Sequence, residues 1–302
     1  MKIFPFVLLI FITSCEQNLS SSSFSNVPVQ YTADQFGEYW YSSKAEVASY
    51  SLQQSRYGEI RMGEAVMIFV TEPFSNKKQV KLDNPKEAGE DEVTVMKMNF
   101  TRNFLTGIYP YSMMLSVFTP IDSYHHPKTL KSALSSQEWC GQAFSQFNLK
   151  GNSYEFVGYS YFETEGDRQE KLSAAVLEDE LFTRTRLNPG ALPTGEFEII
   201  ASSFYNRFYH IPFSVEKATG TLTPLDSTTV YSVKYNNGKR EISIEFKNDF
   251  PYIIERWEEK DISEKGESFI STGTLLKTLH TDYWSKNSSN FEYLRDSLQL
   301  KN

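Results

Sequence analysis

One cysteine and four histidines are the side chains of this sequence that could together form a nucleophilic site. Cys140 stands between Trp139 and Gly141, and the histidines are His125, His126, His210 and His280. A cysteine nucleophile needs a base that holds its thiolate, so the minimum components are present. The residues around Cys140 match neither of the common cysteine-protease signatures. A lone cysteine is more often a small buried apolar residue, and we expect Cys140 to be buried.

Three carboxylates form a second group that could do chemistry. Glu163, Glu165 and Asp167 stand at alternate positions, and in an extended strand this spacing places Glu163 and Glu165 on one side. Two carboxylates held across a cleft catalyse glycoside hydrolysis. The same cluster is common where a strand ends in a turn, here at Gly166. A hydrolase that uses Cys140 or these carboxylates is therefore one alternative function.

The sequence predicts no metal site and no cofactor. His125 and His126 are adjacent, and adjacent side chains of a strand point to opposite faces. The spaced Cys and His ligands that are typical of zinc sites are missing. The sequence also lacks the dinucleotide, Walker A, GxSxG and HExxH motifs. An enzyme is therefore the less favoured interpretation.

The N-terminal segment carries a different chemistry, which is lipid attachment. Lys2 is followed by an apolar run over 3–12, and Ile12-Thr13-Ser14-Cys15 matches the lipobox at which lipoprotein signal peptidase cuts before a lipid-bearing cysteine. The run is too short to cross a bilayer as a mature helix. We therefore expect residues 1–14 to be a signal peptide. Acyl chains on Cys15 would then anchor the protein to a bacterial membrane, at the outer membrane or the periplasmic face.

Composition sets limits on the partners of the chain. The sequence has 302 residues and a formal net charge of −8, and it contains no strong basic patch, which disfavours nucleic acid as a partner. A serine run at 20–23 predicts a flexible tether over 15–35. Dense aromatic content follows, and we expect one mainly β domain over 36–302 with a helix at its C-terminus.

Most of that domain shows an alternation of apolar and polar residues, which predicts β-strands. The strongest signal is 229–246, where two alternating runs flank Asn236-Asn237-Gly238, a typical hairpin turn. Further predicted strands are 45–57, 59–71, 113–119, 143–149, 196–205 and 251–258. Short connections between them favour antiparallel pairing.

Two segments show helical spacing of apolar residues, 168–187 and 289–300, whereas 84–92 and 259–267 are charged and predict exposed loops. The expected fold is a predominantly antiparallel sheet, strongly curved or half-barrel in shape, with one or two packed helices. A concave sheet rich in aromatic residues would suit a lipid or an acyl chain. The predicted ligand contacts are Phe69, Met96, Met98, Tyr159, Tyr161 and Tyr231, and the alternative for each of them is ordinary core packing.

Several strings of the mature chain resemble a family of bacterial lipoproteins. They include Arg56-Tyr57-Gly58-Glu59-Ile60, Gly63-Glu64-Ala65-Val66 and Thr106-Gly107-Ile108-Tyr109-Pro110. The likeness continues through 137–141, 160–163 and 193–195, and covers nearly all of the mature chain. The family brings no established activity, so it implies no functional residue.

Chains of this kind are often labelled septum formation inhibitor Maf. The genuine Maf proteins are cytosolic nucleotide pyrophosphatases with an α/β fold, and their Ser-x-Ser-Pro-Arg-Arg signature has no counterpart in this sequence. We therefore expect the label to be mistaken. The opening strands are also similar to those of envelope proteins that curl an antiparallel sheet into a half-barrel.

These observations predict a membrane-anchored envelope lipoprotein without enzymatic activity. We expect it to bind an apolar ligand, such as a lipid, or a partner protein of the envelope. A structural component of envelope assembly is a further alternative, and it would show a large exposed apolar patch.

Overall fold

Residues 31–263 and 265–300 are described by a computed structural model. The strands are β1 (Ala45–Arg56), β2 (Glu59–Ser75), β3 (Glu92–Thr106), β4 (Tyr109–Pro120), β5 (Lys131–Glu138), β6 (Gly141–Lys150), β7 (Ser153–Ser160), β8 (Arg168–Ser173), β9 (Val176–Leu177), β10 (Gly195–Ile200), β11 (Val215–Pro224), β12 (Thr228–Tyr235), β13 (Arg240–Lys247), β14 (Ile254–Ile262) and β15 (Ser268–Thr281). The α-helices are α1 (Ala33–Trp40), α2 (Pro85–Ala88), α3 (Leu181–Leu187), α4 (Ser203–Tyr209) and α5 (Tyr293–Ser297), and five short 3-10 helices are η1 (Gly89–Asp91), η2 (Glu178–Glu180), η3 (Pro189–Ala191), η4 (Tyr283–Ser285) and η5 (Ser289–Phe291). The predicted signal peptide, Cys15 and the tether up to residue 30 lie outside the described residues.

All fifteen strands belong to one sheet, in the order β8-β7-β6-β5-β4-β3-β2-β1-β15-β14-β13-β12-β11-β10-β9. Neighbouring strands are antiparallel, except for the short parallel pair of β9 and β10. The sheet is not closed, and β8 and β9 are its two edges. The predicted fold class, a mainly β protein with a curved antiparallel sheet and few helices, is confirmed.

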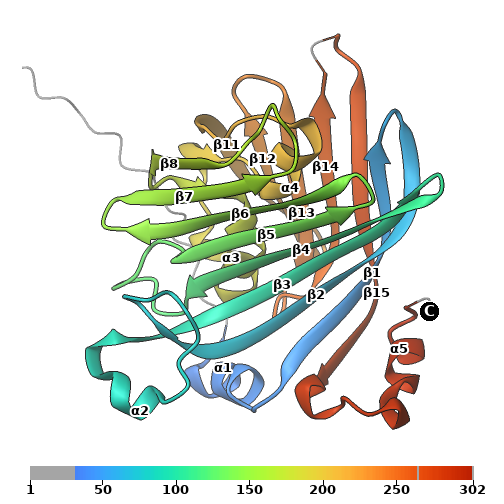
Figure 1. The fold of residues 1–302 in the computed structure, drawn as a ribbon. Helices are drawn as coiled ribbons and strands as arrows, with labels where there is room; N and C mark the ends of the chain where they lie inside the picture. Colours follow the sequence, from blue (N-terminus) through green and yellow to red (C-terminus); the bar gives the residue numbers. More distant parts are fainter. Residues whose placement is uncertain (1–30, 264, 301–302) are drawn as a thin grey trace, which may run out of the picture.

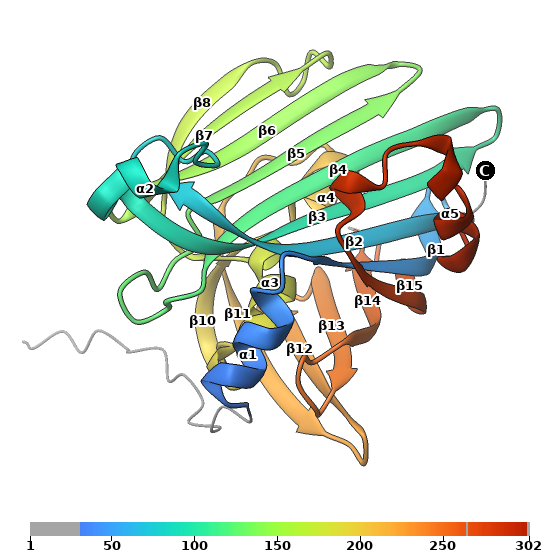
Figure 2. The ribbon, with the colours of Figure 1, turned by 90° about the horizontal axis from the view of Figure 1, so that it is seen from below.

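The sheet bends so strongly that its two arms face each other. One arm contains β2 to β8 and the other contains β10 to β14, and Figure 2 shows α3 and α4 between them. Leu181 and Phe182 of α3, together with Phe204 and Phe208 of α4, belong to the same buried cluster as the inward side chains of both arms. The segment from η2 to α4 therefore fills the space that an empty half-barrel would leave.

A second apolar cluster joins the two edges of the sheet. Phe147 of β6 and Phe156 of β7 pack with Leu177 of β9 and Ile200 of β10, and Phe213 contributes a ring 4.9 Å from that of Phe156. Because these side chains leave water together, the edge strands are held near each other without a hydrogen-bonded closure.

Most of the strands predicted from local sequence signals are found in the structure. The hairpin predicted at 229–246 is β12 and β13, joined at Gly238 with a φ of 70°. A short helix near 289–300 is confirmed as α5, after η5. The predicted strands at 45–57, 59–71, 113–119, 143–149 and 251–258 fall on β1, β2, β4, β6 and β14.

The helix predicted over 168–187 is wrong for its first half. Arg168–Ser173 forms β8, because the edge of β7 offers unpaired backbone groups that this segment can satisfy, and only Leu181–Leu187 is α-helical. The strand predicted over 196–205 ends at Ile200, where Ser202 caps α4. The predicted loop at 84–92 contains α2 and η1, and β14 covers the first part of 259–267.

Side chains alternate between an inner face of the sheet, towards α3 and α4, and an outer face. On β3, the inward positions hold Met98, Phe100 and Phe104, with Arg102 between the last two. Arg102 is buried, so an inward position of a strand carries a charge. Similar inward charges are Glu46 on β1 and Glu259 on β14. Each of them has an ionic partner, as burial of a charge demands.

Most of the hairpin turns lie at one end of the strands, and helix α1 lies at the other end. The turns of β1–β2, β3–β4, β5–β6, β7–β8, β12–β13 and β14–β15 lie at one end, because the strands alternate in direction. Helix α1 lies at the opposite end (Figure 1). It is capped by Thr32, whose side chain accepts a hydrogen bond from the backbone N–H of Gln35. We call the end that carries the six turns the turn end of the sheet.

Candidate functional site

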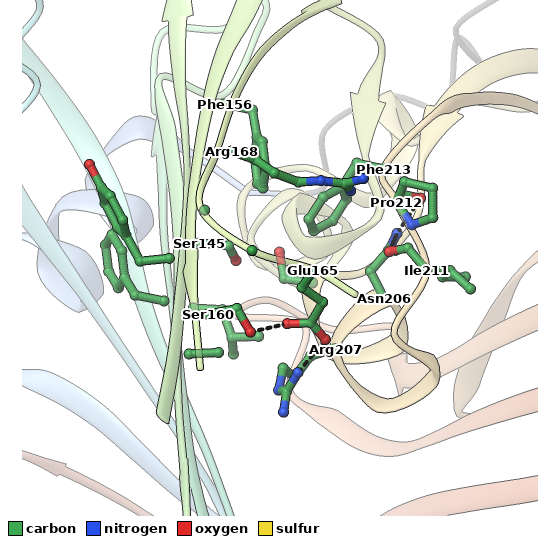
Figure 3. Close-up of a pocket in the computed structure, with 17 residues that line it drawn as sticks. Ser145, Phe156, Ser160, Glu165, Arg168, Asn206, Arg207, Ile211, Pro212 and Phe213 are labelled. Atoms are coloured by element: carbon green, nitrogen blue, oxygen red, sulfur yellow. Dashed lines mark hydrogen bonds and ion pairs between the residues drawn. The ribbon is translucent and has the colours of Figure 1, made fainter. Parts of the chain in front are cut away.

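A pocket opens at the turn end, between β5–β8 and the segment that follows α4 (Figure 3). Its volume is about 70 Å³. We call it the edge pocket. The side chains that give it its chemical character are Ser145, Phe156, Ser160, Glu165, Arg168, Asn206, Arg207, Ile211, Pro212 and Phe213.

Small residues explain why the sheet is hollow at this place. The register of β6 and β7 pairs Ala143 with Ser160 and Ser145 with Gly158, on the same inner face as the pair of Phe147 and Phe156. Further from the turn end, these inward positions hold phenylalanines that fill the core. A Cβ atom on Gly158 would lie 2.9 Å from Cζ of Phe156, so the glycine also makes room for that ring.

The opposite wall is held in place by α4. The buried carboxylate of Asp179 accepts hydrogen bonds from Oγ of Ser203 at 2.6 Å and from Oγ of Ser132 at 3.1 Å, which ties the start of α4 to β5. Burial raises the pKa of Asp179, and the hydroxyl donors oppose that rise. After α4, the Asn206 amide donates to the backbone oxygen of Pro212 at 3.0 Å. This fixes the loop that carries Ile211 and Phe213.

A charged network closes one side of the edge pocket. Arg207 Nη1 donates to Glu165 Oε1 at 2.5 Å, and His210 Nδ1 lies 2.5 Å from the same oxygen. Ser160 Oγ donates to the other carboxylate oxygen, Oε2. The second guanidinium nitrogen of Arg207, Nη2, contacts Glu138 at 3.5 Å. Since each charge has an opposite partner, this side of the pocket is polar but electrically balanced.

Two polar side chains of the pocket, Asn206 and Arg168, have hydrogen-bonding capacity that a ligand could use. Oδ1 of Asn206 is buried without a hydrogen-bond partner, although the residue is only 4% exposed. Arg168, which Figure 3 shows reaching towards Phe213, makes a loose 3.6 Å contact with Glu170. An acceptor and a donor are therefore available beside apolar walls.

The volume of the edge pocket limits what it can hold. A cavity of about 150 Å³ accommodates benzene, so about 70 Å³ suits a smaller apolar group, such as an aliphatic side chain or the end of a chain. A complete acyl chain does not fit in this conformation. The arrangement is that of a binding site with apolar walls and a few polar groups at its rim.

The structure separates the six residues predicted to contact a ligand. Phe69, Met96, Met98 and Tyr231 are buried in the main core, and the Tyr231 hydroxyl donates to the Pro193 carbonyl at 2.7 Å. These four pack against protein, which is the alternative weighed for each of them from the sequence.

Tyr159 and Tyr161 lie elsewhere. Tyr159 pairs in register with Phe144, and alternation along β7 and β6 places both side chains on the outer face. Tyr161, after the end of β7, is 72% exposed. The six residues therefore do not form one surface. Of the six, only Tyr159 lies beside the edge pocket, on a strand that forms its wall, and its side chain points to the opposite face of the sheet.

The residues of the hydrolase alternative are also placed apart. Cys140 lies exposed in the turn between β5 and β6, so its expected burial is wrong. Among the described residues, no hydrogen bond links Cys140 to a histidine. His125 lies 2.5 Å from Asp122, and the ring of His280 stacks on that of Tyr39.

The three carboxylates of that alternative share the turn between β7 and β8. Glu163 and Asp167 are exposed, whereas Glu165 is bound by Arg207 and Ser160. They do not face one another across a cleft, which is the geometry that glycoside hydrolysis requires.

Sequence reasoning missed most of the pocket, yet a signal for it was present. On β6 and β7, every second residue points to the inner face, as Phe147 and Phe156 do. The next positions on that face hold small residues, namely Ala143, Ser145, Gly158 and Ser160. A run of small residues on an apolar face predicts a local hollow. The opposite wall could not be found this way, because Asn206 and Phe213 reach it through contacts distant in the sequence.

Comparisons with protein-family models, curated proteins and solved structures gave no match. Among the described residues, no helix combines the length and the apolar character needed to cross a bilayer. Functional inference therefore rests on the residues themselves.

Proposed function

We propose that this protein is a lipid-anchored binding protein of the bacterial cell envelope, without enzymatic activity. It binds its partner by one small apolar group inserted into the edge pocket. The observation that carries the proposal is the pocket itself, with aromatic and aliphatic walls beside the unsatisfied Asn206 acceptor, at a place where the inward side chains of the sheet are small.

The pocket favours recognition of one group over transport of a whole lipid. Its floor is small, whereas Ile211 and Pro212 at its edge are exposed and can contact the rest of a larger partner. Burial of a small aliphatic group releases about 0.8 kcal/mol per CH₂, and a hydrogen bond to Asn206 adds specificity. An apolar side chain of an envelope protein and the end of an acyl chain both satisfy these demands.

The position of the pocket agrees with an N-terminal anchor. The described chain starts beside α1, at the end of the sheet opposite the turn end, and Figure 1 shows α4 far from α1. The predicted tether from Cys15 would therefore leave the edge pocket facing away from the membrane that holds the lipid. A partner could approach from the space between the membranes.

A specific observation favours assembly as a second function. Adjacent turns expose large apolar side chains, which are Tyr57, Ile60 and Met62 near β1–β2, Leu105 and Ile108 at β3–β4, and Trp139 at β5–β6. Ile108 is 83% exposed, the highest value of these six. Such neighbouring apolar tips are typical of interaction surfaces. The variant Ile108→Lys would reduce the size of any native complex seen by sedimentation if this surface is used, and leave it unchanged otherwise.

Native mass spectrometry of protein purified from its own membranes tests the proposed function. Ser145→Leu fills the floor of the edge pocket, and Gln146→Leu makes a similar change one residue later, on the outer face of β6. We expect the wild type and Gln146→Leu to retain a bound lipid or polypeptide, and Ser145→Leu to lose it. A wild type without bound mass, or equal retention by both variants, would contradict the proposal.

A further inference from the structure

A second and larger hollow lies on the other side of α4. It is bordered by α4 and by the ends of β12, β13 and β14, and its volume is about 490 Å³. Ligand pockets commonly enclose ~300–1,000 Å³, so this space is large enough for a small molecule. We call it the tyrosine pocket. Asn206, Ile211 and Pro212 border both pockets, whereas the aromatic and charged side chains of the tyrosine pocket take no part in the proposed function.

Aromatic rings form much of its wall. The rings of Tyr205 and Tyr209, one turn apart on α4, are 5.0 Å apart, and Tyr235 of β12 lies across from them. The Tyr235 hydroxyl is engaged, since it donates to Glu178 at 2.7 Å. The hydroxyl of Tyr205 has no hydrogen bond within the described residues. Tyrosine presents an apolar ring face and a polar tip, and both reach this space.

Charged groups border the pocket in a fixed arrangement. Arg240 Nη1 donates to Asp261 Oδ1 at 2.5 Å, and the guanidinium lies 4.6 Å from the centre of the Tyr205 ring. Oδ2 of Asp261 accepts from the Tyr209 hydroxyl at 3.2 Å. Arg240 is also held by Glu178, so the guanidinium and the carboxylate keep their positions before any ligand arrives.

The remaining polar groups of the wall carry charges of both signs and offer free hydrogen-bonding capacity. Lys239 is exposed at the rim, and Glu216 accepts from the Asn237 amide at 3.1 Å. The charged side chains at the pocket wall are the cations Lys239 and Arg240 and the carboxylates Glu216 and Asp261, and Glu178 binds Arg240 from behind. Asn206 lines this pocket as well as the edge pocket, and its buried Oδ1 has no partner in the described chain.

We infer that the tyrosine pocket binds a neutral, polyhydroxylated ligand, namely a hexose unit of a glycan. A sugar ring can pack its C–H faces on Tyr205 and Tyr209 while its hydroxyls donate to Asp261 and accept from Lys239. Each hydroxyl is both donor and acceptor, which matches a wall that contains both kinds of group.

Other ligand classes fit these observations less well. An anion would meet Asp261 and Glu216, a polyamine would meet Arg240 and Lys239, and an acyl chain would leave several polar groups without hydrogen bonds. The presence of both cations and carboxylates in the wall therefore favours the neutral sugar.

Ligand-observed NMR on the full chain tests the inference. The probes are glucose, galactose, mannose and N-acetylglucosamine, with inorganic phosphate and spermidine as charged comparisons. The variant Tyr209→Ala removes a ring and a hydrogen bond from the pocket. Tyr124→Ala is the matched control, because Tyr124 is 88% exposed in the loop between β4 and β5.

We expect at least one sugar to bind the wild type and Tyr124→Ala alike, and to bind Tyr209→Ala about tenfold more weakly. A second variant, Lys239→Ala, should also weaken binding, and its exposed position makes misfolding an inadequate explanation. Absence of sugar binding, binding of phosphate or spermidine alone, or equal binding by Tyr209→Ala would overturn the inference. Ser145→Leu should leave sugar binding intact, which separates this result from that of the edge pocket.

Discussion

Arg102 of β3 and Glu259 of β14 form a two-bond ion pair in the core. Nη1 donates to Oε2 at 2.8 Å and Nη2 donates to Oε1 at 2.7 Å, and both side chains are almost completely buried. Their strands are separated in the sheet by β2, β1 and β15. The pair can form because the sheet bends, so it links the two arms across the space that α3 and α4 fill.

Loss of one partner of this pair should destabilise the fold strongly. The variant Arg102→Met leaves Glu259 buried without its bidentate partner, although Arg240 remains 3.6 Å away. Breaking a buried ion pair costs about 3–5 kcal/mol, and we expect a loss in the free energy of unfolding of about this size. Urea denaturation measures it.

The exposed pair of Arg256 and Glu258 provides the control. Its N–O distance is 2.8 Å, but the two side chains are 40% and 37% exposed. Arg256→Met should therefore change stability by less than about 1 kcal/mol. Equal losses in the free energy of unfolding for Arg102→Met and Arg256→Met would contradict the stabilising role of the core pair.

Asp261 should make stability depend on pH. Burial raises the pKa of this carboxyl from 3.8 to about 6, and the neighbouring Arg240 opposes the rise; Glu259 and Glu178 add to it. The folded-state pKa lies above the unfolded one, so the stabilisation from Asp261 is complete below about pH 4. This contribution to the free energy of unfolding, about 3 kcal/mol, is lost as the pH rises through about 6.

The comparison with Asp261→Asn isolates this contribution. We expect the stability of the wild type, relative to the variant, to fall as the pH is raised from about 4 to 7. Denaturant unfolding at several pH values measures the difference. A difference that is constant, or that grows with pH, would refute the raised pKa.

The parts of the fold that could be predicted are those set by nearby residues. The hairpin of β12 and β13 follows from alternation around Asn237-Gly238, and the first strands follow from similar alternation. The helical spacing over 168–187 was misleading, because Leu172 belongs to an edge strand paired with Tyr154. Pairing with β7 overrode the local periodicity.

The candidate site could be predicted only in small part. Glu165 was identified as a carboxylate near a turn, but its partner Arg207 lies 42 residues later and reaches it through the packing of α4. Likewise, the apolar residues on alternating strands belong to the core where their side chains point inward, as for Met98. The sequence shows which residues of a strand share a face, whereas the curvature of the whole sheet decides which face becomes the interior.

Cys140 should react in the folded protein. Its thiol lies exposed at the turn between β5 and β6, so a maleimide should label it to completion without denaturant. The variant Cys140→Ser should retain the bound partner of the wild type, because the thiol does not line the edge pocket. Labelling that needs denaturant would contradict the exposed position.

The proposed lipid anchor is tested at Cys15. The variant Cys15→Ala should lose fatty-acid labelling and move from the membrane to the soluble fraction, because no acyl chains could then be attached. Metabolic labelling with palmitate and fractionation measure both effects. Unchanged labelling would refute the anchor, and it would leave the edge pocket and the tyrosine pocket untouched as hypotheses.

In-cell photo-crosslinking from Ile211 tests the binding function most directly. Ile211 lines the edge pocket and is 39% exposed, so a photoreactive residue at this position would touch a bound partner. Thr221, exposed on β11, serves as the control position. We predict an adduct of defined mass, lipid or polypeptide, from position 211 that is absent from position 221 and is lost when Ser145→Leu is added. Equal crosslinking from both positions, or none from position 211, would contradict the account.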